Sequence, residues 1–394
     1  MEGVKQMIYL DNASTTRIDP EVLDAMMPYM QDGYGNPGTL YKMGRQAKAA
    51  VDNARLQVAD FIEADPHQII FTSSGTEANN MVFFSLAENL KRTKRKHIIT
   101  SATEHDSVLK AVNSMCIKHG FYKSIIDVDE YGLVIPKILD ATIKEDTGIV
   151  SVMYVNNETG AENDVEEIGR LCRERGVYFH TDCVQAAGSF DIDVNKIRCD
   201  FLSLSSHKIH GPKGCGALYA RPEVLTPFIS GGVSQEFGLR GGTENVAAIV
   251  GFGKACEIAK KEIRNNDIYT STLKQMFFTE LDRVLGCAGL DGILHINGDS
   301  LIRHGKILNV RFDGVDGETL LLMLDSRGVC VSAGSACRSR ESEPSHVLTA
   351  MGISPDDARN SIRVSFSKMN SSDEVLSAAR IIAECAGGLY NGND

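Results

Sequence analysis

The chain has 394 residues, 43% hydrophobic and 24% charged, which is the composition of an ordinary folded protein with room for two domains. Its formal net charge of -11 disfavours broad attraction to nucleic acid phosphates or anionic membrane surfaces. The 10 cysteines are scattered without Cys-x-x-Cys pairs, which argues against zinc ribbons and a secreted disulfide framework. With no signal peptide or membrane span in the pattern, we expect a cytoplasmic protein that binds neither nucleic acid nor membrane.

Short runs of β-forming residues alternate with amphipathic helical stretches from about residue 20 to 260. The clearest strands are expected at 69–72, 97–100, 149–154, 178–181 and 201–204. Ahead of the first of these strands, apolar residues such as Ala47, Val51 and Val58 recur at helical spacing. This alternation predicts an α/β domain, in which helices cover both faces of a mostly parallel sheet.

Polar residues follow several of these strands, at the edge where open α/β sheets bind ligands. The strand at 69–72 leads into Ser-Ser-Gly-Thr-Glu at 73–77, where backbone N–H groups and a hydroxyl at a helix start could hold an anion. The alternative is a plain N-cap with a capping Glu77. His105 and Asn157 follow the next strands, and each could be a satisfied loop residue. Their recurrence at successive strand ends predicts a shared ligand pocket.

The strand at 178–181 ends in Asp182, and Gln185 follows shortly after it. A carboxylate at this place can keep the nitrogen of a pyridine ring protonated, which makes the ring an electron sink. The alternative is that Asp182 only caps the next helix.

Ser205, Ser206, His207 and Lys208 come at the end of the strand at 201–204. An aldehyde cofactor needs an amine that holds it as a Schiff base, and its phosphate needs nearby hydroxyl and N–H donors. Together with Asp182, the segment therefore predicts attachment of pyridoxal 5'-phosphate (PLP). The alternatives are a surface lysine, or metal binding by His207 and His210. Phosphate binding by His207 fits the pocket better, and we expect no metal.

Beyond Thr243 the pattern changes to a long helical stretch, then to short strands and helices near 307–312, 318–324 and 362–366. We therefore expect a large PLP-binding α/β domain at 16–260. A smaller α+β domain is expected at 261–394, together with the N-terminal residues 1–15. Because no long linker separates the domains, they should pack tightly.

Cys337 lies in a segment of small residues that neither helix nor strand patterning explains. Arg338 and Arg340 would favour its thiolate, which is the reactive form of a cysteine. A lone loop cysteine is often incidental, and the neighbouring Cys330 fits a core position. With a PLP pocket in the same chain, we predict that Cys337 is a nucleophile on a mobile loop of the small domain.

Motifs along nearly the whole chain resemble those of the cysteine desulfurases of the NifS/IscS type. They lie at 9–16, 35–37, 103–105, 155–160, 206–214 and 334–337. The resemblance implies a PLP-dependent transferase of fold type I, similar to the class-V aminotransferases. It also implies that the large domain holds a mostly parallel, seven-stranded sheet.

The resemblance assigns roles to individual residues. Lys208 would be the Schiff-base lysine, Asp182 the partner of the pyridine nitrogen and His105 the imidazole stacked on the cofactor ring. Gln185 and Asn157 would bind the side of the ring that carries the hydroxyl. The phosphate would be held by Gly75, Thr76, Ser205, His207 and, from the partner subunit of a homodimer, Thr243. Arg363, with Asn157, would bind the substrate carboxylate.

The implied reaction converts L-cysteine to L-alanine and leaves a persulfide on Cys337. An acceptor protein such as an iron–sulfur scaffold would then receive the sulfur. A selenocysteine lyase or a cysteine sulfinate desulfinase relative is the alternative within enzymes. A non-catalytic scaffold in a sulfur-transfer complex is the alternative of another class.

Several positions depart from the family's usual residues, namely Gly38, Tyr41, Val233, Ser234 and Gly241. In the family these positions line the pocket rim and the subunit contact, so substrate scope and subunit packing are the properties they would affect. Cys183, beside Asp182, stands where a small residue is common and could serve packing alone.

Overall fold

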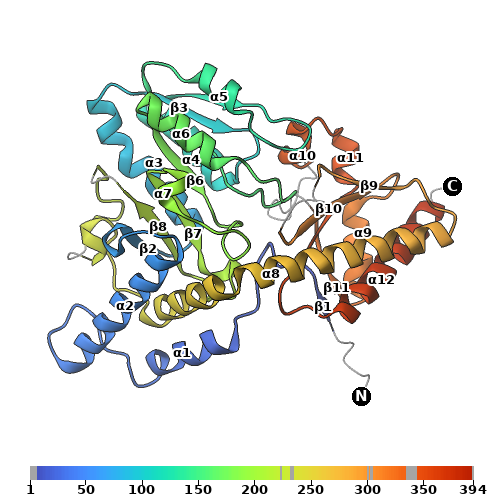
Figure 1. Ribbon diagram of the computed structural model, residues 1–394, viewed down its shortest axis with the longest axis horizontal. Helices are drawn as coiled ribbons and strands as arrows, with labels where there is room; N and C mark the ends of the chain where they lie inside the picture. Colours follow the sequence, from blue (N-terminus) through green and yellow to red (C-terminus); the bar gives the residue numbers. More distant parts are fainter. Residues whose placement is uncertain are drawn as a thin grey trace.

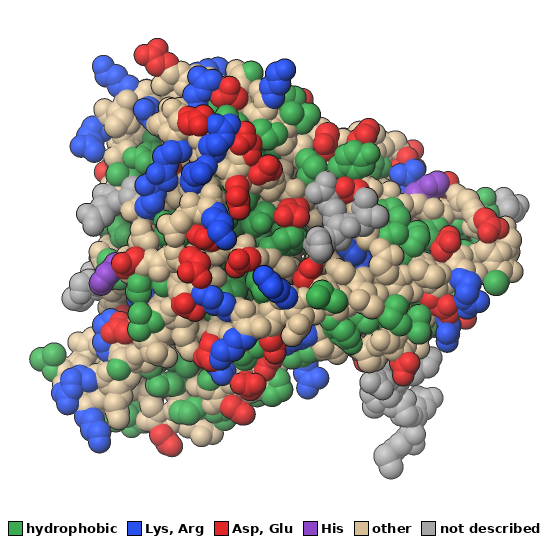
Figure 2. Space-filling model, in the orientation of Figure 1, with side chains coloured by type: hydrophobic (Ala, Val, Ile, Leu, Met, Phe, Trp, Pro, Cys, Tyr) green, Lys and Arg blue, Asp and Glu red, His purple; other side chains and the backbone are tan. Residues whose placement is uncertain are grey.

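A computed structural model shows two lobes joined by the long helix α8 (Val246–Cys287), which runs from one lobe into the other (Figure 1). The structure describes residues 7–221, 224–230, 235–299, 301, 305–333 and 344–392. Among them we find no helix with the length and apolar character that crossing a bilayer requires. Acidic and basic side chains are interspersed over the face shown in Figure 2.

The large lobe is built on a seven-stranded sheet. Its strands, in spatial order, are β2 (Ile69–Thr72), β8 (Gly216–Ala220), β7 (Phe201–Ser205), β6 (Tyr178–Asp182), β5 (Thr147–Ser151), β3 (His97–Ser101) and β4 (Tyr122–Ile126). Of these described strands, β8 alone runs in the opposite direction, so that its pairs with β2 and β7 are antiparallel. The mostly parallel, seven-stranded sheet that the sequence predicts is therefore confirmed.

Alternating side chains along the strands divide between two cores, one on each face of the sheet. Ile98 and Phe201 pack with α3 (Gly75–Arg92) and α4 (Asp106–His119). Their neighbours Ile99 and Leu202 face the other side, which α2 (Lys42–Phe61), α6 (Val165–Arg175) and the first part of α8 cover. The remaining large-lobe helices are α1 (Pro20–Met30), α5 (Pro136–Thr142) and α7 (Val194–Ile197).

The small lobe holds an antiparallel sheet covered by helices. Its strands are β12 (Ser332–Ala333), β13 (Ser361–Ser365), β10 (Ile307–Phe312) and β9 (Leu294–Ile296). The helices are α9 (Gly317–Ser326), α10 (His346–Ala350), α11 (Pro355–Arg359) and α12 (Ser372–Gly392). At the N-terminus, β1 (Ile8–Tyr9) pairs in parallel with β11 (Val329–Cys330), so the start of the chain packs on the small lobe.

Helix α8 contributes to both lobes. Its residues Ala248 to Ala259 belong to the core of the large lobe, whereas Leu273 to Leu285 belong to the core of the small lobe. The helix continues without a break at the domain boundary expected near residue 260. That boundary stays a prediction.

The strand expected at 149–154 is shifted in the structure, where β5 starts at Thr147 and ends at Ser151. Val152 and Tyr154 still donate backbone hydrogen bonds to β6, at His180 and Asp182. The extended, apolar run thus continues past the strand, and its backbone stays hydrogen-bonded to β6.

Candidate active site

A cavity of about 320 Å³ lies where the carboxyl ends of the large sheet face the small lobe. A cavity of this volume suits a small molecule. The predicted residues in its lining are Gly75, Thr76, His105, Asn157, Asp182, Gln185, Ser205, His207, Lys208 and Arg363. The structure thus brings together all the predicted site residues except Thr243 and Cys337.

Cys337 lies outside the described residues, but the chain on both sides of its segment is placed. Before it, β12 pairs with β13, and Ser332 lies opposite Arg363. After it, Pro344 and His346 line the cavity. Both described ends of the Cys337 segment are therefore next to the cavity.

Thr243 is exposed and does not line the cavity of its own chain. The segment before it is anchored to the large lobe by two ion pairs. Glu236 pairs with Arg55 at 2.7 Å in the protein interior, and Arg240 pairs with Glu77 at 2.8 Å. These two ion pairs hold the segment that precedes Thr243 on the large lobe.

Lys208 ends a short 3-10 turn that follows β7 directly. Its Nζ donates hydrogen bonds to the backbone carbonyls of Ala13 at 2.5 Å and Ser14 at 2.6 Å. Burial, followed by the positive charges of Arg363 and Lys306, lowers the pKa of Lys208 to about 7. A large fraction of this amine is therefore neutral, and nucleophilic, at neutral pH.

This lowered pKa predicts how the apoprotein takes up PLP. The rate of covalent attachment to Lys208 should rise with pH through about 7 and level off above it, because the neutral amine is the nucleophile. An ordinary lysine would show a rate still rising near its usual pKa of 10.5. Stopped-flow absorbance of PLP against pH measures the midpoint, and a midpoint near 10 would contradict the burial of Lys208.

One end of the cavity is suited to a phosphate group. Here α3 begins, and the Ser74 hydroxyl caps it by accepting a hydrogen bond from Glu77 N at 3.1 Å. A Cβ atom on Gly75 would lie 2.7 Å from Val184 Cγ2, which is too close. Glycine at this position therefore lets the start of α3 pack directly against Val184. The buried hydroxyl of Ser205 has no hydrogen-bond partner within the described residues and can donate to an anion.

His207 lies at the same end. Burial, together with the charges of Lys208, Lys213 and Lys306, lowers the pKa of His207 to about 4, so the ring is neutral at pH 7. Its Nδ1 lies 3.2 Å from the Thr15 hydroxyl. If Nδ1 accepts from that hydroxyl, the proton is on Nε2 and can be donated to a phosphate oxygen.

The cavity lining also holds two groups that suit a pyridine ring. Asp182 Oδ1 accepts a hydrogen bond from Val184 N at 2.9 Å, and Asp182 Oδ2 accepts one from Asn79 Nδ2 at 2.7 Å. Gln185 Nε2 donates to Ala13 O at 2.8 Å, which leaves the buried Oε1 without a partner among the described residues. A ring hydroxyl would supply the donor that Oε1 lacks.

His105 caps the N-terminus of α4. Its Nδ1 accepts a hydrogen bond from Ser107 N at 3.1 Å and lies 2.7 Å from Ser107 Oγ. Because Nδ1 is an acceptor, the neutral imidazole carries its proton on Nε2.

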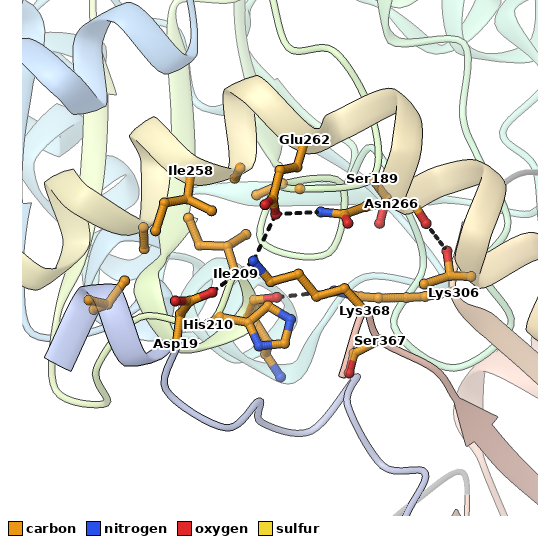
Figure 3. A pocket seen from close by; sticks show the side chains of 17 residues that line it. Asp19, Ser189, Ile209, His210, Ile258, Glu262, Asn266, Lys306, Ser367 and Lys368 are labelled. Carbon is orange, nitrogen blue, oxygen red and sulfur yellow. Dashed lines mark hydrogen bonds and ion pairs between the residues drawn. The ribbon is translucent and has the colours of Figure 1, made fainter. Parts of the chain in front are cut away.

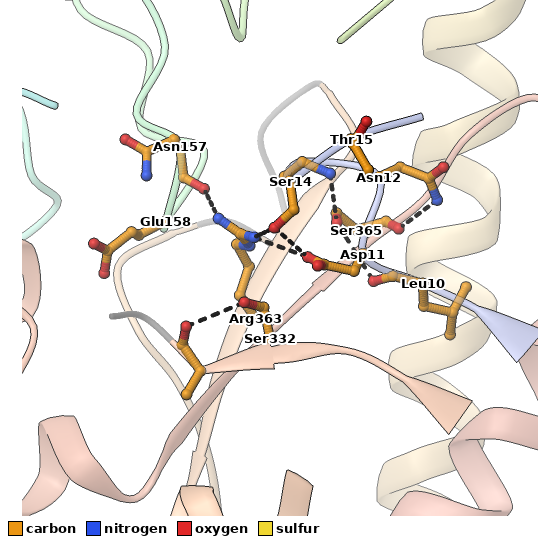
Figure 4. A network of polar contacts seen from close by, with 12 residues as sticks. Leu10, Asp11, Asn12, Ser14, Thr15, Asn157, Glu158, Ser332, Arg363 and Ser365 are labelled. Carbon is orange, nitrogen blue, oxygen red and sulfur yellow. Dashed lines mark hydrogen bonds and ion pairs between the residues drawn. The ribbon is translucent and has the colours of Figure 1, made fainter. Parts of the chain in front are cut away.

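Arg363, on β13, is held in one orientation by the N-terminal segment (Figure 4). Nη2 donates to Asp11 Oδ1 at 2.8 Å and to Ser14 Oγ at 2.6 Å, while Nη1 donates to the carbonyl of Asn157 at 2.8 Å. Nε is buried and has no partner among the described residues. The guanidinium is thus a preformed fork with donors still to be satisfied, as a carboxylate site requires.

The sequence did not assign roles to several residues of the cavity. Asp11 and Ser14 belong to the recognised N-terminal motif, but only the fold brings them to Arg363, more than 300 positions along the chain. Asn79 lies one turn into α3, and Ser107 is the second residue of α4. For His346 the sequence gives no signal.

A second, smaller cavity of about 40 Å³ lies beside the backbone of Lys208 (Figure 3). Lys368 bridges Asp19 at 2.8 Å and Glu262 at 2.7 Å there. Lys306 is buried, donates to the carbonyl of Lys208 at 3.1 Å, and supports the position of that residue from behind.

His210 lies in this second cavity, with its Nδ1 bound to Arg17 O at 2.9 Å. Among the described residues, no group of three or more His, Cys, Asp or Glu side chains is placed so that it could hold a metal ion. Cys183 is fully buried in the core, where burial raises the pKa of its thiol well above the usual range. Packing is the role that this position supports.

Glu104 is fully buried behind the cavity, and burial raises its pKa from 4.5 to about 8. Between these two values the folded state binds more protons than the unfolded state, so stability should fall as the pH rises through this window. At about 1.4 kcal/mol per pKa unit, the loss approaches roughly 5 kcal/mol. Glu104→Gln, which cannot ionise, should melt like the wild type at pH 5 and at a higher temperature at pH 9.

Glu130→Gln is the matched control, because Glu130 is exposed. Thermal denaturation of the three proteins at pH 5, 7 and 9 measures the effect. Equal pH slopes for the wild type and Glu104→Gln would show that Glu104 does not titrate in this way.

The comparisons with known proteins agree with this fold and cavity. Residues 8–377 match the family described as aminotransferase class-V, so the chain belongs to that class of enzymes. The family is PLP-dependent, which accords with the polar groups that line the cavity.

Similar proteins identify the family within this class. The cysteine desulfurase IscS of Methanosarcina thermophila is 42% identical over 390 residues, 98% of this chain and 93% of the relative. The solved structure of a NifS-like protein has a TM-score of 0.86 and 35% identity, covering 96% of this chain and 99% of that one. A structure described as SspA in complex with cysteine has a TM-score of 0.75 and 32% identity, with 91% and 98% covered. Within the class, the chain is a cysteine desulfurase, as its motifs indicate.

Proposed function

We propose that this chain removes sulfur from L-cysteine with the help of PLP, forms L-alanine, and carries the sulfur as a persulfide on Cys337. The observation that carries the proposal is that one cavity is lined by a half-buried, partly neutral lysine, a carboxylate, an imidazole and a buried arginine. The cysteine bound to SspA supports L-cysteine as the substrate.

The cavity residues fit PLP at both ends. The unpartnered hydroxyl of Ser205 and the start of α3 suit its phosphate, and the unpartnered Gln185 Oε1 suits its ring hydroxyl. Asp182 would hold the proton of the pyridine nitrogen, and Lys208 would form the covalent link. When bound, PLP would supply the electron sink that stabilises negative charge next to the substrate's amino group.

Three side chains of the cavity would then bind the substrate and transfer its protons. Arg363 binds the carboxylate of cysteine and thereby fixes the amino acid in the cavity. The substrate's amino group takes the place of Lys208 in the covalent link, and the released Nζ, neutral because of its lowered pKa, accepts the proton from the substrate's Cα. His105 Nε2–H can donate a proton within the cavity.

The sulfur transfer itself would be performed by Cys337. Its thiolate attacks the sulfur of the substrate, the new S–S bond forms, and the Cβ–S bond breaks with its electrons on carbon. Protonation of that carbon gives alanine, and the persulfide remains on Cys337. An acceptor protein such as an iron–sulfur scaffold would then receive the sulfur from this segment.

We also propose a homodimer in which Thr243 reaches the phosphate site of the partner subunit. Its exposure and its absence from the cavity of its own chain support this arrangement. Large apolar side chains between α1 and α2 are exposed, with Tyr34 at 77% and Leu40 at 88%, and a partner subunit would cover such a surface. The cytoplasmic location stays a prediction.

Cys337→Ser tests the proposal. The wild type, loaded with PLP, should convert cysteine to alanine over many turnovers when a reducing thiol releases the sulfur. The serine variant should bind PLP normally and lose alanine formation by ~100-fold or more, because it lacks the attacking thiolate. Amino-acid analysis measures alanine, and Cys330→Ser is the control. Full turnover by Cys337→Ser would exclude the persulfide step and favour a selenocysteine lyase or sulfinate desulfinase.

A further inference from the structure

An unbroken line of hydrogen bonds joins Asp182 to His105 through two residues that have no role in the reaction described above. Asn79 Nδ2 donates to Asp182 Oδ2 at 2.7 Å and to Ser107 Oγ at 2.8 Å. Ser107 Oγ in turn lies 2.7 Å from His105 Nδ1. The line starts on β6, passes through α3 and ends at the first turn of α4.

The direction of each hydrogen bond is fixed by the chemistry of the groups. An ionised Asp182 only accepts, so the amide group of Asn79 must turn its NH₂ toward it. Both hydrogens of that NH₂ are then used, and the hydroxyl of Ser107 is an acceptor toward Asn79. Its own hydrogen is free to be donated to His105 Nδ1, which also accepts from Ser107 N.

The two linking residues are shielded from solvent. Asn79 is 1% exposed and Ser107 is 7% exposed. Asn79 Oδ1 has no partner among the described residues, so the amide is held by its two donated bonds alone. Buried bonds of this kind give one stable arrangement, because a lost partner leaves a polar group unsatisfied.

We propose that Asn79 and Ser107 are positioning residues, which fix the carboxylate of Asp182 and the ring of His105 relative to each other so that PLP fits between them. The inference rests on the proposed function. In this arrangement the contact between α3 and α4 keeps Asp182 and His105, the two groups expected to touch the cofactor ring, in a fixed position relative to each other. Residues that orient the groups around a cofactor or metal commonly change its affinity by ~10–100-fold when they are removed.

Asn79→Leu tests the inference, because leucine fills a similar volume and removes both donors. The matched control is Asn89→Leu, since Asn89 is also buried on α3 and its Oδ1 is also without a partner in the described chain. We expect Asn79→Leu to bind PLP at least ~10-fold more weakly, with an altered visible spectrum, and Asn89→Leu to bind like the wild type. Titration of the apoproteins with PLP, followed by absorbance, measures both.

Ser107→Ala and Ser107→Thr complete the test, even if Asn79→Leu fails to fold. Ser107→Ala should lower kcat more than it changes the KM for cysteine and weaken PLP binding, and Ser107→Thr, which keeps the hydroxyl, should restore both. Wild-type PLP affinity and spectrum in Asn79→Leu and Ser107→Ala would overturn the inference. PLP binding by the wild type without alanine formation would overturn only the proposed function.

Discussion

Lys208→Ala protein is expected to lose covalent attachment of PLP and at least ~1,000-fold of its alanine formation. The buried Nζ of Lys208 is bound to two backbone carbonyls of the N-terminal segment, and its lowered pKa makes it both the attaching nucleophile and the acceptor of the Cα proton. Borohydride reduction followed by peptide mass analysis shows whether the coenzyme is linked to residue 208. Alanine formation is measured on the same samples.

Lys213→Ala is the control, because Lys213 lies five positions away on the exposed surface and does not line the cavity. It should keep both the covalent link and the activity. Reduced coenzyme attached to another lysine in the wild type would contradict the assignment of Lys208.

Arg363→Lys is expected to raise the KM for cysteine by ~10–100-fold and to reduce kcat much less. Lysine keeps the positive charge but loses the planar fork, which removes at least one charge-assisted hydrogen bond of about 1.5–3 kcal/mol to the carboxylate. The effect should disappear with cysteamine, which lacks the carboxylate. Initial-rate kinetics with both compounds separate a binding defect from a general loss of structure.

Arg170→Lys is the matched control, since Arg170 forms a bidentate pair with Glu167 on the surface, at 2.7 and 2.6 Å. Its kinetics should match those of the wild type. An equal loss with cysteine and cysteamine in Arg363→Lys would mean that Arg363 supports the fold of the cavity and does not bind the carboxylate.

The N-terminal segment connects the groups that these two variants change. Asp11 and Ser14 hold Arg363, the carbonyls of Ala13 and Ser14 hold Lys208, and the carbonyl of Ala13 also accepts from Gln185. A short stretch of chain from the small lobe thus orients residues of both lobes at one cavity. This explains why the first motif of the sequence is needed for a site whose predicted cofactor-binding residues begin at Gly75.

Much of the large lobe could be predicted from the sequence. Strands such as β2 and β7 are buried along their whole length and lead into polar residues, which is typical of a strand that ends at a ligand site in an α/β sheet. Strand β4 was missed because it is half exposed and carries Tyr122, Lys123 and Ser124, which give no apolar run. Strand β8 was missed because its small residues Gly216 and Ala217 also suit a loop.

The fine structure of the site could not be predicted in the same way. The positions of Asp182 and Lys208 at strand ends indicate a ligand site, but the residues that orient them come from distant segments of the chain. Asn79 lies 103 positions from Asp182, and Asp11 lies 352 positions from Arg363. Only the packing of α3 and of the N-terminal segment on the sheet brings these pairs together, and no local pattern records it.

The central claim is that sulfur from cysteine becomes attached to Cys337, and one measurement tests it directly. The PLP-loaded protein is mixed with a slight excess of cysteine in the absence of reductant, alkylated and digested, and the peptide containing Cys337 is weighed by mass spectrometry. We predict a peptide heavier by one sulfur atom, formed together with one molecule of alanine per modified subunit. Formation of alanine with an unmodified Cys337 peptide would contradict the claim.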